Sequence, residues 1–521
     1  MHRAPQCVLL LLAWGASWSF IRVASCANAP SSKPVKVILW FDTEDYLLKA
    51  DDDADKRLAE MLTARHIRAT FKVVGEKARV LEQRGRQDVI TAMKQHDIGY
   101  HSNLHSVHPA PTEYLADCGF LDGVDEFVRR EARGAADVRR IFNVPTLVCY
   151  GQPGSSWASQ AIAALPRCGV SNDGIPCYLD SGSQIGLGGT PFWYCGALNV
   201  YDMRGHETRM DLFNDAEPLQ GDRRFDELAT RLTKEGGGLI SIYYHPCEFV
   251  QEEFWDKVNF ARGENPPREE WKPEPQKPAA ETEKAFERFG QYLDHLAANP
   301  GVVFITASQL PRYYPDHLRE DGASPDQVLE LARRITDKDS KGIGFQSIGN
   351  KVCSPADQFA LLATVVDRLA SGEAVAPDAA IHVPKLLLGP DGEPPPGAGP
   401  AEPLRWPAFR DAVHDADDFV QAQHRIPARV FIGPDAVSPA DFLFGMAAAY
   451  IQFQETHRLP ASVTLGKNVR LLTADYVVKS SPRVYGGWII HRENFEAPHV
   501  LEIARLQAWT LKPATPWQST P

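Results

Sequence analysis

Short apolar runs alternate with amphipathic segments over residues 35–314, and this alternation limits the folds open to the chain. The run at residues 35–41 (VKVILWF) predicts a buried strand, and Leu58 and Leu62 then recur at the spacing of one helix face. Residues 69–74 predict a second strand, and the same rhythm continues downstream. Repeated strand–helix units of this kind predict an α/β fold with a mainly parallel sheet or barrel.

Composition narrows the classes of protein further. The chain has 521 residues, of which 44% are apolar and 10% aromatic, enough to bury at least two ordinary cores. The net charge of -12 is spread along the chain, and no Lys/Arg-rich block alternates with aromatic residues, so we expect no nucleic-acid partner. No segment of the mature chain approaches the roughly 18 consecutive apolar residues of a transmembrane span.

Residues 1–29 have the pattern of an export signal: a basic start at Arg3, an apolar stretch at residues 8–21 and small residues after it. We therefore expect a secreted, periplasmic or lipid-anchored protein. The lipid anchor is one of two alternatives at Cys26, because residues 23–26 (VASC) fit the box before a lipidated cysteine. In the other alternative Cys26 is removed with the signal.

The cysteines downstream of the signal do not suggest a structural metal site. Seven follow Cys26 and none forms a C-x-x-C pair, so structural zinc on thiolates is unsupported. Export permits disulfides, but the sequence does not give their pairing, and the odd number leaves at least one thiol over. These cysteines are Cys118, Cys149, Cys168, Cys177, Cys195, Cys247 and Cys353.

Polar residues suited to metal catalysis follow several of the predicted strands. His101 and His105 come after a short strand, the acidic segment 42–45 (DTED) ends the first strand, and His245 ends a later one. Such fold classes place their active sites just past the carboxyl ends of the strands. Two imidazoles with a carboxylate leave a divalent metal net positive and open to water, which predicts a metal-dependent hydrolase.

The order and spacing of these segments resemble the NodB-type polysaccharide deacetylases. The likeness lies in residues 41–42, 69–75 (ATFKVVG) and 96–105 (HDIGYHSNLH) and in His245, and it spans residues 35–315. It implies a distorted, incomplete (β/α) barrel. It also implies hydrolysis of N-acetyl or O-acetyl groups of a carbohydrate polymer on a divalent metal, usually zinc or cobalt.

The resemblance also implies a role for each matching residue. His101 and His105 correspond to the two histidine ligands of the metal. The acidic ligand follows the catalytic aspartate directly in most members and at one remove in others. Here Thr43 occupies the adjacent place, so Glu44 is our choice, with Asp45 as the alternative.

Two further positions concern proton transfer. Asp42 corresponds to the general base and His245 to the proton donor for the leaving group. The family normally has an arginine that orients the base, but the best-aligned residue in segment 150–154 (YGQPG) is the uncharged Gln152. The resemblance therefore leaves open what holds Asp42.

Downstream of residue 319 the pattern changes to short helices, so we expect a mainly helical repeat region over residues 320–513. Segment 425–433 (RIPARVFIG) is echoed by segment 458–466 (RLPASVTLG). One helix-start signal, an N-cap serine followed by a proline and a polar residue at N3, also recurs. It occurs at Ser324, Ser354 and Ser438.

These repeats resemble, in pattern more than in rare residues, the pseudomurein-binding type of repeat, which implies attachment to a cell-wall polymer. The alternative is a helical domain that packs on the first one and binds nothing. In addition, five prolines within residues 262–280 predict an extended surface excursion from the first domain.

The hypothesis from sequence is an exported hydrolase of non-peptide carbon–nitrogen bonds that deacetylates a polysaccharide or oligosaccharide on a divalent metal, most simply zinc. Two alternatives remain. One is a catalytically inactive glycan-binding protein on the same scaffold, which the absent arginine favours. The other is a metal-dependent amidase that acts on a non-sugar amide.

Overall fold

A computed structural model gives the architecture, and it describes residues 34–212, 220–373, 376–394, 403–478 and 487–515. The predicted export signal and Cys26 lie outside the described residues. Within those ranges no helix combines the length and the apolar character needed to cross a membrane. The seven described cysteines all have free thiols, so the disulfides that export would permit are not formed among them.

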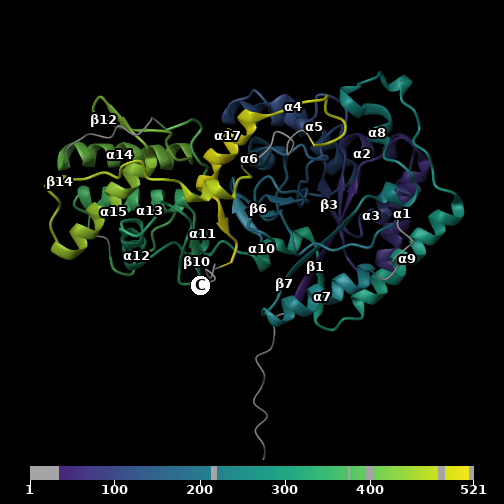
Figure 1. Cartoon of the computed structure of the whole chain (residues 1–521), viewed down its shortest axis with the longest axis horizontal. Helices are drawn as coiled ribbons and strands as arrows, with labels where there is room; N and C mark the ends of the chain where they lie inside the picture. Colours follow the sequence, from purple (N-terminus) through teal and green to yellow (C-terminus); the bar gives the residue numbers. More distant parts are fainter. Residues whose placement is uncertain (1–33, 213–219, 374–375, 395–402, 479–486, 516–521) are drawn as a thin grey trace, which may run out of the picture.

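A parallel sheet forms the centre of the first half of the chain (Figure 1). Its strand order is β3-β2-β1-β7. β8 and β2 lie on the same side of β1, where β8 pairs with the first residues of β1 and β2 pairs with the last ones. All of these pairings are parallel, as the repeated strand–helix pattern predicts. The strands are β1 (Val35–Thr43), β2 (Thr70–Val73), β3 (Asp97–Tyr100), β7 (Gly238–Tyr244) and β8 (Val302–Ile305).

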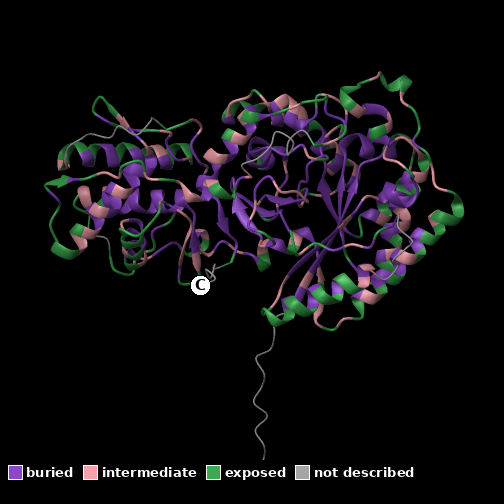
Figure 2. Cartoon of the chain, in the orientation of Figure 1, coloured by how far each residue is buried: buried purple, intermediate pink, exposed green. Residues whose placement is uncertain are grey.

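The middle of β1, from Val37 to Phe41, is continuously apolar because both of its faces are covered. Phe41 points outward and stacks on Phe71 with ring centroids 4.8 Å apart. It also meets Phe289 of α9 (Ala279–Ala297) edge-on, with ring centroids 6.2 Å apart. Trp40 points inward, where it packs with residues of neighbouring strands such as Leu179 and Val200. Strands buried on both faces are continuous apolar runs rather than alternating ones. Figure 2 shows these strands buried at the centre of the domain.

The sheet curls into an incomplete barrel. Beyond β3, single parallel bridges join Tyr100 to Tyr150 and Tyr150 to Tyr178. The last of these residues belongs to β4 (Cys177–Leu179), which pairs in parallel with β6 (Ala197–Val200). A further bridge joins Glu207 to Ser241 of β7. The prediction of an α/β fold with an irregular, incomplete barrel is confirmed.

Amphipathic helices cover the outer face of the sheet. α5 is the clearest case, because Phe120, Phe127 and Val138 lie buried on one face while Arg129 is exposed. It ends at Asn143, which adopts the left-handed conformation common after a helix. The covering helices include α1 (Lys49–Ala64), α2 (Gly75–Gln83), α3 (Gln87–Met93), α5 (Phe120–Phe142), α7 (Gln220–Lys234) and α9 (Ala279–Ala297).

The second half is mainly helical, as expected. Ser324, Ser354 and Ser438 each accept a hydrogen bond from the backbone N–H three residues later, which confirms the recurring helix-start signal. Asp441 differs from the pattern, because its carboxylate accepts from the Val469 N–H instead of reaching back to the serine. The main helices are α12 (Pro325–Ile335), α13 (Pro355–Ala370), α14 (Trp406–Gln423) and α15 (Pro439–Thr456).

The end of the chain returns to the first half (Figure 1). α17 (Pro498–Gln507) contacts α6 (Ser159–Ala164), and β15 (Lys512–Pro513) pairs with β5 (Phe192–Tyr194). The Nζ of Lys512 lies 2.8 Å from both Asp316 and Asp357, a buried junction between the halves. The boundaries at residues 35–315 and 320–513 stay a prediction, and the last part of the second region packs on the first.

Candidate metal centre

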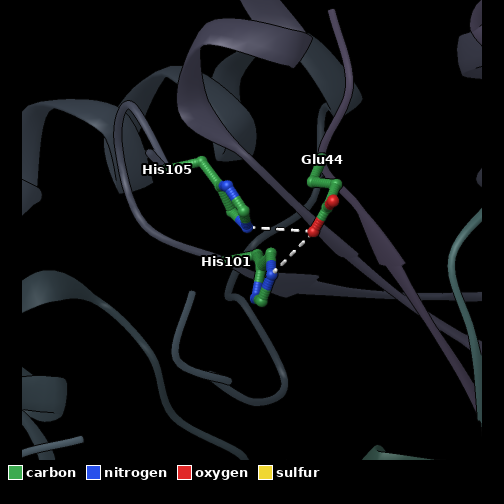
Figure 3. A group of neighbouring side chains, drawn as sticks. All are labelled: Glu44, His101 and His105. Atoms are coloured by element: carbon green, nitrogen blue, oxygen red, sulfur yellow. Dashed lines mark ion pairs between the residues drawn. The ribbon is translucent and has the colours of Figure 1, made fainter. Parts of the chain in front are cut away.

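Two loops bring three donor side chains together (Figure 3). Glu44 follows β1, and His101 and His105 follow β3. The Glu44 Oε2 lies 2.9 Å from the Nε2 of His105 and 3.7 Å from the Nε2 of His101. All three side chains are buried, and neither Nε2 has a hydrogen-bond partner. Buried polar atoms are rarely left unpaired, so this cluster fits a bound cation.

The outer ring nitrogens of the two histidines are held by neighbouring oxygens. The Nδ1 of His101 lies 3.0 Å from the carbonyl oxygen of Gly151, and the Nδ1 of His105 lies 2.7 Å from the Ser106 hydroxyl. A carbonyl oxygen only accepts, so the Nδ1 of His101 carries the hydrogen and its Nε2 presents a lone pair to the cluster. Such outer contacts are what orients a histidine that binds a metal.

The electrostatics suit a cationic guest. Burial disfavours the charged form of Glu44, but His105 and His245 outweigh it and hold the pKa of Glu44 well below its usual range. Burial also lowers the pKa of His101, which favours the neutral imidazole needed in a ligand. Two imidazoles and one carboxylate are a donor set that zinc and similar divalent ions accept.

Asp45, the alternative ligand, faces away from the cluster. Its carboxylate accepts from the Leu47 N–H at 2.8 Å and from the side-chain amide of Gln251. It belongs instead to a separate buried acidic group with Asp51 and Glu274. These contacts favour Glu44 over Asp45.

Asp42 and His245 flank the three donors. The Nε2 of His245 lies 3.8 Å from the Oδ2 of Asp42 and 3.9 Å from the Oε2 of Glu44. The Oδ1 of Asp42 lies 3.3 Å from the Nδ1 of His101. The structure therefore brings together all five residues that the sequence singled out, although they come from three separate segments.

His245 is the most accessible member, with a side chain 20% exposed. Its Nδ1 lies 2.5 Å from the Oε1 of Glu248, whose other oxygen pairs with Arg209. Burial lowers the pKa of His245, but Glu44 and Glu248 outweigh it and raise that pKa to about 9. Both carboxylates therefore favour the protonated imidazole. The sequence analysis missed Glu248, although its position three residues after His245 could have indicated it.

The sequence analysis also missed Lys72 of β2. Its Nζ lies 2.8 Å from the Oδ1 of Asp42 and 2.7 Å from the Oδ2 of Asp180. A lysine inside an otherwise apolar strand was the available signal. Gln152, which aligns with the expected arginine, is instead hydrogen-bonded to the Gly154 carbonyl and the Tyr178 hydroxyl.

One wall of the centre comes from the second half of the chain. The ring of Trp488 meets the ring of His105 edge-on at 5.3 Å, and its Nε1 donates to the Oδ2 of Asp256 at 2.9 Å. Nearby, the Nδ1 of His491 lies 2.8 Å from the Oε1 of Glu113. No local pattern in the sequence could have indicated a residue this far along the chain.

Comparison with known proteins gives likenesses in structure alone. The sequence matches no family model and no curated protein. Solved structures similar to this chain include a putative polysaccharide deacetylase from Mycobacterium smegmatis (14% identity, 55% of this chain and 91% of that chain, TM-score 0.33). They also include the Puue allantoinase (13%, 55% and 92%, TM-score 0.33) and the Bc1960 peptidoglycan N-acetylglucosamine deacetylase (14%, 54% and 88%, TM-score 0.28). TM-scores this low do not establish an activity.

Proposed function

We propose that the protein is a metal-dependent hydrolase that removes acetyl groups from a carbohydrate polymer. The observation that supports the proposal most directly is the convergence of Glu44, His101 and His105, with two unpartnered Nε2 atoms facing one carboxylate. Glu44, His101 and His105 would hold a divalent ion, for which zinc is our choice. The chemistry supplied by such an ion is a lower pKa for water and polarisation of the substrate carbonyl.

The flanking residues divide the proton transfers between them. Asp42 is buried and its pKa is lowered, because His101, Lys72 and His245 together outweigh the effect of burial. It is therefore a carboxylate able to take a proton from the attacking water. Glu44 and Glu248 favour the protonated form of His245, which is also more accessible, so it can give a proton to the departing nitrogen or oxygen. Glu248 holds the imidazole of His245 from behind.

The carbohydrate as substrate rests on the sequence resemblance described above. Export of the enzyme to the cell envelope rests on the signal-like pattern of residues 1–29. Attachment of residues 320–513 to a cell-wall polymer is a separate proposal. The site itself would serve equally for a non-sugar amide, because its residues act on the acyl group and the leaving atom. The test must therefore compare substrates.

The experiment measures acetate released from glycans, and the ring-opened product of a cyclic amide, formed by the full chain after chelation and after reloading with zinc. N-acetylated chito-oligosaccharides and O-acetylated xylan serve as glycan substrates, and a small cyclic amide serves as the non-sugar control. We expect acetate from a glycan only with metal. Hydrolysis of the cyclic amide alone would indicate an amidase. Glycan binding without acetate, unchanged in His101→Ala and His245→Ala, would indicate an inactive binding protein.

A further inference from the structure

Lys72 is a fully buried cation on the central sheet, and its surroundings hold its ammonium in one place. The Nζ donates to the Leu179 carbonyl at 2.8 Å and to the Oδ2 of Asp180, and it forms an ion pair with Asp42. The face of the Trp40 ring lies 4.1 Å from the same atom. Two hydrogen bonds and the ion pair with Asp42 thus fix the position of the ammonium.

The fold makes room for this cation. A Cβ on Gly151 would lie 1.9 Å from the Nζ of Lys72, and a Cβ on Gly99 would lie 3.2 Å from its Cγ. Any side chain at residue 151 would therefore displace the ammonium. Burial of a charged group is strongly unfavourable unless the charge is well paired. A lysine buried in the central sheet, with glycines at the positions where a side chain would collide with it, therefore calls for a functional explanation.

The geometry at Asp42 supplies that reason. Its Oδ1 faces Lys72 at 2.8 Å, while its Oδ2 faces His245 at 3.8 Å. The Oδ1 of Asp42 is thus held by the buried ammonium of Lys72, and its Oδ2 faces the metal centre. Asp180 holds Lys72 from the far side, and its own Oδ1 accepts from the Ser181 N–H at 2.7 Å.

We propose that Lys72 is the positioning residue for Asp42, supplying from β2 the cation that the sequence lacks at Gln152. The inference rests on the proposed function, because it assigns a role in the proton transfer made by Asp42. Asp180 and Gly151 support the same arrangement. Asp180 forms an ion pair with the ammonium, and Gly151 leaves the space that the ammonium occupies. The absence of the expected arginine then gives no support to an inactive protein.

The test compares Lys72→Met with a matched control, Lys512→Met. Lys512 is also buried and lies 2.8 Å from two carboxylates, but it joins the two halves of the chain away from the metal centre. We expect Lys72→Met to keep its metal and its KM within about threefold, and to lose about 10²-fold in kcat, the cost of misplacing a reacting group by an ångström. Lys512→Met should lower stability and leave kcat of the folded protein unchanged.

A double-mutant cycle separates positioning from mere support of the fold. In an Asp42→Asn background the Lys72→Met change should cost no further kcat, because its only target is already gone. An additional loss there, or wild-type kcat in Lys72→Met alone, would overturn the inference. A crystal structure of Lys72→Met adds a readout independent of activity. If the Asp42 carboxylate in this variant stays within about 0.5 Å of its wild-type position, the inference is wrong. This readout does not depend on acetate release, so it tests the role of Lys72 even if the proposed function fails.

Discussion

The Oε2 of Glu44 lies 2.9 Å from the Nε2 of His105, a buried contact between the carboxylate and one imidazole of the cluster. A divalent ion held by the cluster would use both of these atoms, so Glu44→Gln is expected to remove most of the bound metal by deleting the one anionic donor. Asp45→Asn is the matched control, because Asp45 is adjacent and equally buried but faces Gln251. It should retain one ion per chain by elemental analysis after dialysis. The reverse result would make Asp45 the ligand.

His245→Ala should separate catalysis from metal binding. The imidazole lies 3.9 Å from Glu44 and is held by Glu248, which suits a proton donor rather than a ligand. We expect kcat to fall by about 10²- to 10⁴-fold, the usual contribution of general acid–base catalysis, with metal content unchanged. Steady-state kinetics beside elemental analysis would check both. Loss of the metal in this variant would reassign His245 as a ligand.

Much of the site follows from local sequence pattern, because its residues lie just past strand ends. Asp42 and His245 end strands that pair with each other, so their convergence follows once the sheet is parallel. Lys72 was not predictable in the same way, since its partners depend on the register of β2 and on a loop more than a hundred residues away. Trp488 depends on the return of the chain end, which no periodicity encodes.

The separate acidic group of Asp45, Asp51 and Glu274 makes stability depend on pH. Burial, Asp45 and Glu274 raise the pKa of Asp51 well above its usual range, and burial and Asp45 raise that of Glu274 to about 7. A carboxyl group whose pKa is higher in the folded state binds its proton more tightly there. The stability that this acidic group contributes is therefore fully present below the ordinary carboxyl pKa of about 4 and is lost as pH rises toward 7.

Asp51→Asn should relieve this loss. We expect its free energy of unfolding in urea to exceed the wild-type value at pH 8 by on the order of 1–3 kcal/mol, and the gain to shrink at pH 5. Asp53→Asn is the control, since its side chain is 69% exposed and should change stability by less than about 0.5 kcal/mol. The prediction would be wrong if Asp51→Asn were less stable than the wild type at pH 8 and calcium stabilised the wild type. Asp45, Asp51 and Glu274 would then be ionised carboxylates around a bound cation.

The contribution of Trp488 to the metal centre can be tested by a substitution at Gly154, which lies against its ring. Gly154 has a φ of +50°, and a Cβ there would lie 2.2 Å from the Trp488 ring. Gly188 has a φ of +58° with nothing within 4 Å of such a Cβ, so Gly188→Ala measures backbone strain alone. Strain of this kind costs about 1–2 kcal/mol, and forced overpacking adds about 1–3 kcal/mol.

We therefore expect Gly154→Ala to be less stable than Gly188→Ala in urea unfolding. It should also lose acetate release and metal affinity, because Trp488 packs against His105 and its Nε1 donates to Asp256. Gly188→Ala should keep both properties. Equal losses of stability in the two variants, with metal affinity unchanged, would mean that Trp488 moves aside freely. The end of the chain would then cover the metal centre without helping to hold His105 in place.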